Sequence, residues 1–415
     1  MDVPYNMRSM TFPEKGRKIN DCDKNSSCIV KIIPETDLPN QLYEYSKNYF
    51  YSANLITDFL LDENQNDIGK LDTYFFSIAF LYRHSLELCL KAIGLQLIKG
   101  ENEQIKFIKE TFHNLFEILT VLNNINKNER PNKEMEWLKK YLFDLSGMDK
   151  ESDSFRYPFH IVHEFDEWNV EKQYSIQVIF DEQTHIDLVQ FANKFEAAYE
   201  IVDKWYRKDQ SEAVEWKELT PTFIETGGYY YAQSVVGYKY NKDVFYSYTK
   251  AYLETANYLK WYCKNIKGPK KNICMKKIFL PMCYLYRNSI ELSLKQIWFE
   301  ETEENFQKKC KFMLGKKHSI NGLWNKIKPY VTHIFNSEDD LENIKVIEDY
   351  CLQLHNFDND ANKFRYPMTK YMKPYFYSNR KFDFFKTGDF LEALSNSLDN
   401  IDYALNEYNQ HISDM

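Results

Sequence analysis

Glycine and proline are scarce in this chain, since its 415 residues include only 12 of each. This scarcity argues against a turn-rich β-sandwich or barrel. It also argues against a low-complexity disordered chain. The 44% of hydrophobic and 27% of charged residues are typical of helical globular domains. The length suffices for two or three domains of roughly 100–200 residues, each with its own core.

Short motifs for metal and nucleotide binding are also missing. The eight cysteines form no C-x-x-C pair, and the nine histidines form no H-E-x-x-H motif, so a zinc site is not expected. No Walker A loop and no strand-linked G-x-G-x-x-G motif occurs, which disfavours a P-loop or Rossmann nucleotide site. We therefore expect no metal and no cofactor.

Long apolar segments are absent as well. No segment approaches 18 uncharged apolar residues, and the first residues have no apolar core of signal-peptide length. Cys89 and Cys283 lie within apolar helical runs, which favours free thiols in a reducing compartment. We expect a cytoplasmic protein without a membrane partner.

The chain has no excess of positive charge, because its net charge is −8. It lacks the overall basic field that drives non-specific nucleic-acid binding, so any RNA contact needs a local basic patch. Aromatic residues make up 17% of the chain. Their rings could stack on bases, but we expect most of them to fill the core and interfaces.

The sequence contains an internal repeat. Its anchors keep the same order, and the spacing between copies changes only by small steps, as a duplication with loop insertions would leave it. The matched segments are 50–52 with 245–247, 81–88 with 285–292, Lys91 with Lys295, His113 with His318, and 155–158 with 364–367.

The hydrophobic period predicts corresponding helices in the two copies. They span about 41–61 and 243–264, 72–98 and 277–301, 113–126 and 318–333, and 184–206 and 388–411, with a further helix before each Phe-Arg-Tyr-Pro segment. Residues 174–180 alternate polar and apolar, as in a short strand or an extended loop.

We therefore predict a mainly α fold with two tandem homologous bundles of four to five helices, forming an intramolecular pseudo-dimer with minor strand or loop insertions. The predicted parts are a polar arm at 1–35, a first unit at 36–207, a connector at 208–240 that could hold a hairpin, and a second unit at 241–415. The arm is either a mobile tail or a segment packed on the body.

Polar residues recur every fourth position within the longest predicted helix of each copy. Arg83, Glu87 and Lys91 share one helical stripe. Arg287, Glu291 and Lys295 repeat it. Because the surrounding residues are apolar almost all round, we expect an enclosed, paired network, with a functional polar site or a surface row as the alternatives.

The Phe-Arg-Tyr-Pro segments place Arg156 and Arg365 in turns, because proline keeps the preceding residue out of helical geometry. From such a turn, a guanidinium could reach carboxylates such as Glu87 and Glu291, or Asp149 and Asp358. Each arginine is either a structural clamp or an anion-binding group.

One string of residues resembles a known family. Residues 82–93, followed by His113-Asn114-Leu115 and an Arg-Tyr-Pro, look like the HEPN superfamily of small helical bundles found in bacterial toxin–antitoxin and phage-defence proteins. The second half carries similar strings, so the resemblance covers most of 41–207 and 243–412.

The resemblance implies bundles that pair across an interface and, in active members, a metal-independent RNase whose Arg-x4-6-His residues meet there. Histidine would act as general acid or base, and arginine would stabilise the developing phosphorane charge. Arg156 and His163 are the match to this motif in the first copy, and no histidine stands in range of Arg365. His113 and His318 are available as composite partners.

Two functions from different classes follow. One is an intracellular defence or stress-response RNase acting on RNA. The other is a non-catalytic helical module that binds a nucleotide or a protein partner, such as an antitoxin or defence component, and either could be a homodimer. The candidate catalytic residues are Arg156, His163, His113, Arg365 and His318. The candidate binding residues are Arg83, His84, Glu87, Lys91, Arg287, Asn288, Glu291 and Lys295.

Exposure of the arginines should separate the two functions. For an RNase, Arg83, Arg156, Arg287 and Arg365 should line one solvent-accessible cleft together with His113 or His163. Arginines that are paired with their own unit's glutamate and closed off from solvent would favour the binding module.

Overall fold

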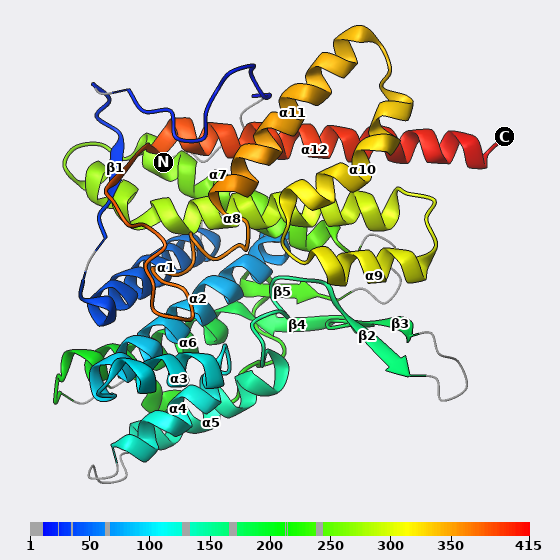
Figure 1. Ribbon diagram of the computed structural model, residues 1–415. Coiled ribbons are helices and arrows are strands. Elements are labelled where there is room, and N and C mark those ends of the chain that lie inside the picture. The colour runs from blue at the N-terminus through cyan, green and yellow to red at the C-terminus, as the bar shows by residue number, and fades with distance from the viewer. Residues whose placement is uncertain are drawn as a thin grey trace.

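A computed structural model describes most of the chain (Figure 1). The described residues are 11–23, 25–34, 36–62, 67–126, 133–165, 172–211, 213, 215–237 and 244–415. Residues 1–10, 24 and 35 of the predicted arm and 212, 214 and 238–240 of the predicted connector therefore lie outside the described part. Within it the protein is mainly α, with twelve α-helices and three two-stranded antiparallel sheets.

The first half of the chain contains six of these helices and four strands. They are α1 (Leu38–Leu60), α2 (Ile68–Leu97), α3 (Glu101–Thr111), α4 (Leu115–Ile125), α5 (Lys133–Met148), β2 (Phe159–Phe165), β3 (Lys172–Val178), β4 (Thr184–Asp187) and α6 (Leu188–Arg207), preceded by β1 (Ile29–Ile32).

The rest of the chain contains the other six helices. Two short 3₁₀ turns (Glu215–Glu218 and Tyr230–Ala232) and β5 (Gln233–Val236) lead to α7 (Tyr246–Asn265), α8 (Lys270–Glu300), α9 (Phe306–Lys316), α10 (Ile320–Ile334), α11 (Glu338–Phe357), β6 (Arg380–Asp383) and α12 (Phe384–Ser413).

Four helices form the centre of the molecule: α1, α2, α7 and α8. Almost every residue of α2 from Tyr74 to Leu95 is buried, as is almost every residue of α8 from Ile278 to Trp298. Helices that are apolar on all sides are stable only inside a fold, which explains why these two occupy the core. In Figure 1, α3–α6 lie beside α2, and α9–α12 lie beside α8.

Two of the three small sheets join segments that are far apart in sequence. β1 pairs with β6, so that Ile29 faces Asp383 and Ile32 faces Arg380. β4 pairs with β5 from the predicted connector, and β2 and β3 form a hairpin. The described part of the connector thus contributes one strand to a sheet and contains no hairpin of its own.

The described part of the N-terminal arm packs on the second half of the chain. Glu14 N–H donates to the Tyr350 hydroxyl at 2.9 Å. The carbonyl of Ile19 accepts from Thr387 Oγ1 at 3.1 Å. The alternative in which the arm packs on the body therefore holds for these residues.

Most predicted helices are present, with ends shifted by a few residues. The helix expected from 184 begins at Leu188, because 184–187 form a strand with β5. The hydrophobic period did not predict α3 and α9, which are short helices with few buried residues. The alternating segment at 174–180 is largely strand β3.

None of the helices in the described residues is both long and apolar enough to span a lipid bilayer.

Gly94 allows close packing of α2 against α3, because a Cβ there would lie 2.3 Å from Phe107 Cε1. We expect Gly94→Ala to lower the free energy of unfolding by about 1–3 kcal/mol through overpacking. Gly147→Ala is the matched control, since nothing lies within 4 Å of its Cβ position in α5, and it should be neutral or stabilising. Urea unfolding measures both variants, and equal effects would contradict the packing role of Gly94.

Candidate functional site

The polar stripe of α2 is a buried network. Arg83 pairs with Glu87, and Lys91 Nζ lies 2.7 Å from Glu87 Oε1. Arg83 Nε also lies 3.0 Å from a carboxylate oxygen of Asp149. The side chains of Arg83 and Glu87 are fully buried, so the enclosed network predicted from the sequence is present.

Helix α8 repeats these contacts. Arg287 pairs with Glu291, and Lys295 Nζ lies 2.7 Å from Glu291 Oε1. Arg287 Nε lies 3.5 Å from Asp358 Oδ2. Arg83 and Arg287 are therefore satisfied by carboxylates and closed to solvent, which removes them from any accessible cleft.

The backbone just before each candidate histidine is strained. Phe112 and Lys317, which precede His113 and His318, both have a φ of 42°, a conformation that is costly for residues with side chains. The buried arginines hold these segments, since Arg83 Nη2 donates to the His113 carbonyl, and Arg287 Nη2 donates to the His318 carbonyl at 2.6 Å.

Each histidine thus precedes a helix rather than starting it. Asn114 caps α4 by accepting from Glu117 N–H, and Ser319 caps α10 by accepting from Gly322 N–H. This arrangement leaves the imidazoles free to point into the polar network.

The Phe-Arg-Tyr-Pro turns are anchored by the same aspartates that pair with the helix arginines. Asp149 accepts from Ser154 N–H at 2.9 Å, and Asp358 accepts from Asn362 N–H at 3.0 Å. The prediction that Arg156 and Arg365 reach these aspartates or the glutamates was wrong. Their guanidiniums stay within their own turns. Arg156 Nε donates to the Ser152 carbonyl, and Arg365 Nε donates to the Ala361 carbonyl at 2.9 Å.

The tyrosine of each turn, and not its arginine, crosses to the other half of the chain. Tyr366 donates to Glu87 Oε1 at 2.6 Å, and its oxygen lies 3.1 Å from His113 Nδ1. Tyr157 donates to Glu291 Oε1 at 2.9 Å and lies 3.1 Å from His318 Nδ1. These two reciprocal contacts, which we call the tyrosine cross-lock, join the two polar networks.

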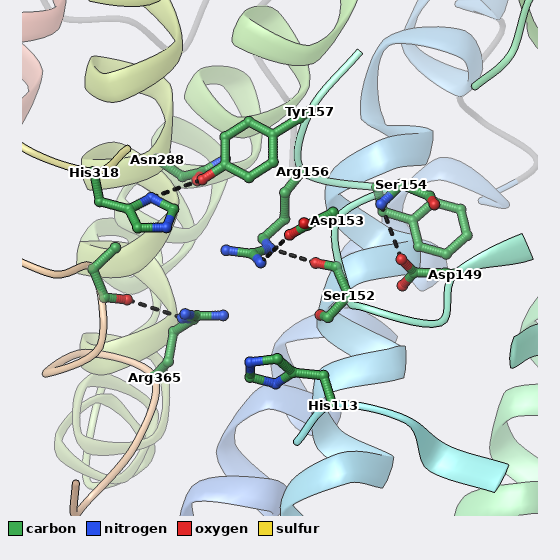
Figure 2. Close-up of polar contacts among 12 residues, drawn as sticks. His113, Asp149, Ser152, Asp153, Ser154, Arg156, Tyr157, Asn288, His318 and Arg365 are labelled. Carbon is green, nitrogen blue, oxygen red and sulfur yellow. Dashed lines mark hydrogen bonds and ion pairs between the residues drawn. The ribbon is translucent and has the colours of Figure 1, made fainter. Parts of the chain in front are cut away.

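The two turn arginines are buried and face the same space (Figure 2). Arg156 Nη2 donates to Asp153 Oδ1 at 2.5 Å, whereas Arg365 Nη2 donates to the neutral amide oxygen of Asn362 at 2.7 Å. Their exposed fractions are 4% and 3%. The remaining nitrogen of each, Nη1, makes no hydrogen bond of good geometry within the described residues, although Arg156 also interacts with the Tyr284 hydroxyl.

Tyr284 lies beside both guanidinium groups. The Arg365 Cζ atom is 5.5 Å from the centre of the Tyr284 ring. Burial raises the pKa of Tyr284, and Arg156 and Arg365 oppose that rise. Two positive charges therefore share a buried space in which Asp153 is a partner for only one of them.

His84 and Asn288 occupy matching positions in α2 and α8 but act differently. His84 Nε2–H donates to the Arg365 carbonyl at 3.2 Å, and burial holds its pKa well below the usual range, so this ring is neutral. Asn288 instead accepts from the Tyr284 hydroxyl at 3.3 Å. His84 thus contacts the turn of Arg365, whereas Asn288 contacts Tyr284 of its own helix.

His163 does not belong to this cluster. It is an exposed residue on β2, where it pairs with Tyr174. The Arg156–His163 pair suggested by the sequence spacing is therefore wrong in its geometry, because the chain leaves the turn as an extended strand. Figure 2 instead places His113 and His318 around the two arginines.

Charge in the network favours ionised glutamates and neutral histidines. Burial alone would raise the pKa of Glu87, but Lys91, His113 and Arg83 hold it well below the usual range. Burial lowers the pKa of His113 to about 4, despite the opposing effect of Glu87. Glu291 raises the pKa of His318 and burial lowers it, with a net decrease.

This protonation state fixes the tautomer. His113 Nδ1 lies 2.9 Å from Glu87 Oε1, and a carboxylate can only accept, so Nδ1 carries the proton. Nε2 then has a free lone pair, as a general base requires. The same assignment holds for His318, whose Nδ1 lies 3.0 Å from Glu291 Oε1.

Solvent reaches the second network through a pocket of about 360 Å³. Tyr157, Lys295 and His318 form its polar wall, with Asp153, Lys317 and His160. The apolar wall consists of Pro158, Phe159, Ile161, Phe245, Met313 and Leu314. Such a mixture of apolar surface and a few convergent polar groups is typical of small-molecule sites.

Metal binding finds no support in the described residues, which contain no group of three or more histidine, cysteine or acidic side chains able to hold a metal ion.

Several residues of the site were not singled out from the sequence. Tyr157 and Tyr366 stand inside the repeated Phe-Arg-Tyr-Pro motif, so their retention in both copies was the available signal. Asp153 and Asn362 differ between the copies, and Tyr284 looks like an ordinary core residue of α8. Asp153 and Asn362 lie three positions before the arginines in the same turns, whereas only the fold brings Tyr284 to them.

Comparisons with protein-family models, curated proteins and solved structures give no match.

The cross-lock should contribute measurably to stability. We expect Tyr366→Phe to lower the free energy of unfolding by about 1–3 kcal/mol, because Glu87 is buried and loses one charge-assisted hydrogen bond. Tyr377→Phe, at a tyrosine that is 76% exposed, should change it by less than about 0.5 kcal/mol. Denaturant titration of both variants gives the comparison, and equal losses would argue against the lock.

The depressed pKa of His113 predicts the direction of the pH dependence. The unfolded chain takes up a proton near the ordinary value of 6.5, while the folded protein does so near 4. The contribution of neutral His113 to the free energy of unfolding is therefore fully present above pH 6.5 and is lost as the pH falls toward 4. His113→Gln should reduce this loss by about 1–2 kcal/mol in denaturation curves across that range.

His411→Gln, at an exposed histidine, is the control for that comparison. Profiles of wild type and His113→Gln that run parallel from pH 6.5 to 4 would show that His113 is not the group responsible.

Proposed function

We propose that this chain is an intramolecular pseudo-dimer of two HEPN-like helical units that binds a nucleotide, with a phosphate group held between Arg156 and Arg365. It is the non-catalytic binding module of the two functions considered from the sequence, and a role in intracellular defence or stress response is what the resemblance implies. The repeated motifs, the matching ion pairs within α2 and α8, and the reciprocal contacts of the tyrosine cross-lock support the pseudo-dimer.

The observation that carries the proposal is the buried arginine pair. Both arginines are at least 96% buried, and Nη1 of each makes no hydrogen bond of good geometry within the described residues. A buried donor without a partner is costly, and two like charges in one space repel. A phosphate would remove both penalties by accepting from the two Nη1 groups.

Burial of the four arginines favours a single nucleotide over an RNA strand as the ligand. The four arginines do not line one open cleft, since two are fully buried in their networks and two are nearly so. A strand of folded RNA needs an exposed basic surface. A single nucleotide needs less surface. Its base would lie in the pocket beside Tyr157, and its phosphate would extend past the pocket lining, which includes Asp153 but neither arginine, toward Arg156 and Arg365.

A second candidate, a metal-independent RNase, draws on the trans arrangement of arginine and histidine. Arg365 lowers the pKa of His113, and Arg156 lowers that of His318, so each histidine lies near the arginine of the other half. Free Nε2 lone pairs beside guanidinium groups could serve as general base and charge stabiliser. This is the composite pairing that the resemblance implies.

Asp153 and Asn362 offer a test that leaves both arginines in place. We expect Asp153→Asn to tighten AMP binding several-fold, because it removes the carboxylate that neutralises Arg156. Asn362→Asp should weaken binding by a similar factor, since it adds a carboxylate beside Arg365. Isothermal titration calorimetry with AMP, inorganic phosphate and adenosine measures these effects.

Opposite shifts for the two variants, with adenosine binding least, would support the phosphate site. Equal binding of adenosine and AMP, or affinities unchanged by both variants, would refute it. Arg380→Ala, at an exposed arginine of β6, controls for general loss of positive charge.

The RNase candidate is tested in parallel. Purified protein is incubated with total RNA and tRNA in EDTA, and compared with folded Arg156→Lys and Arg365→Lys variants, which keep the charge but lose the planar fork. Cleavage that both variants abolish would establish the enzyme. Nucleotide binding without cleavage would leave the binding module as the function.

A further inference from the structure

Two cysteines of the second half lie in contact outside the polar site. Cys263 is near the end of α7, and Cys274 is in the second turn of α8. Their sulfur atoms are 3.4 Å apart, and both are free thiols. The α7–α8 turn therefore brings together two thiols that form no C-x-x-C motif in the sequence.

The surroundings make the two sulfurs unequal. Its hydrogen bond with Cys263, together with Tyr51 and Lys277, lowers the pKa of Cys274 although burial opposes this. The same hydrogen bond and burial raise the pKa of Cys263. The Tyr51 hydroxyl of α1 donates to Cys274 Sγ at 3.9 Å. Cys274 is thus the sulfur that more readily becomes a thiolate, the nucleophilic form.

We propose that Cys263 and Cys274 are an oxidation site, where a hydroperoxide converts the two thiols into an intramolecular disulfide. The Cys274 thiolate attacks one peroxide oxygen, the O–O bond breaks, and the departing hydroxide becomes water, which leaves a sulfenic acid. Cys263 then attacks that sulfur, an S–S bond forms, the S–O bond breaks, and a second water leaves with the Cys263 proton. The thiols lose two electrons, and the peroxide gains them.

Little movement is needed for this reaction. A disulfide has an S–S distance near 2.05 Å, so the sulfurs must approach by about 1.4 Å. Both residues are buried, but Cys274 follows the exposed Ile273 near the start of α8. Helix ends open locally more often than helix centres, which gives a small peroxide access to Cys274.

The site goes beyond the proposed nucleotide binding and does not depend on it. In a reducing compartment, thiols return to the reduced state, so the disulfide would form only under oxidative conditions. When formed, it would fasten the start of α8 to the end of α7.

The test treats folded wild-type protein with hydrogen peroxide, alkylates the remaining thiols in denaturant, and maps peptides by mass spectrometry. The expected result is a disulfide-linked Cys263–Cys274 peptide. Cys89, Cys283 and Cys351 should remain reduced thiols and should therefore be alkylated. Tyr51→Phe should slow formation of the linked peptide several-fold, because it removes one donor to the thiolate.

Variants assign the two roles. Cys28→Ser is the control and should leave the linked peptide unchanged, although Cys28 lies near enough to influence Cys263. Cys263→Ser should leave a sulfenic acid on Cys274 that dimedone traps, whereas Cys274→Ser should give neither product. Full alkylation of Cys263 and Cys274 after peroxide treatment, or a link from either one to Cys28, would overturn the proposal.

Discussion

Glu87 and Glu291 are the two charges on which the rest of the structure depends. Each carboxylate is fully buried and contacts an arginine, a lysine, a histidine and a tyrosine. A buried carboxylate is tolerated only when it is paired, and removing one partner of such a pair costs about 3–5 kcal/mol. Both histidine segments and both Phe-Arg-Tyr-Pro turns supply partners that meet this requirement.

The two tyrosines of the cross-lock make the pairing of each buried glutamate depend on the other half of the chain. Since Tyr366 serves Glu87 and Tyr157 serves Glu291, neither glutamate is fully satisfied by its own half of the chain. The halves are thereby held in one relative placement, and the two turns meet at the centre. The arginine pair is a by-product of the same geometry, since each arginine precedes its tyrosine by one residue.

Part of this arrangement could be predicted from the sequence. The period of apolar residues gave the long helices, and the spacing of Arg83, Glu87 and Lys91 gave the buried stripe, because both depend on local helical geometry. The contacts of the turns could not be predicted, since a turn residue reaches whatever the fold places near it. Arg156 contacts Asp153 within its own turn, whereas the neighbouring Tyr157 contacts Glu291, which is 134 positions away.

His163 illustrates the other limit. Its spacing from Arg156 suits a helix, but Pro158 ends helical geometry and β2 follows. The two halves also differ where the repeat is least exact, at His84 against Asn288 and at Asp153 against Asn362. These differences make the central space asymmetric, with a carboxylate on one side only.

The pairing of the N-terminal arm with the end of the chain has a consequence for folding. Ile19 and Thr387 are 368 positions apart, and β1 cannot pair until β6 has been made. During synthesis, the arm is made long before its partners, so most helices can form before it docks. Closing so long a loop costs conformational entropy, which the contacts with the folded second half must offset. The arm is therefore expected to dock last, on α11 and α12, after the rest of the chain has folded.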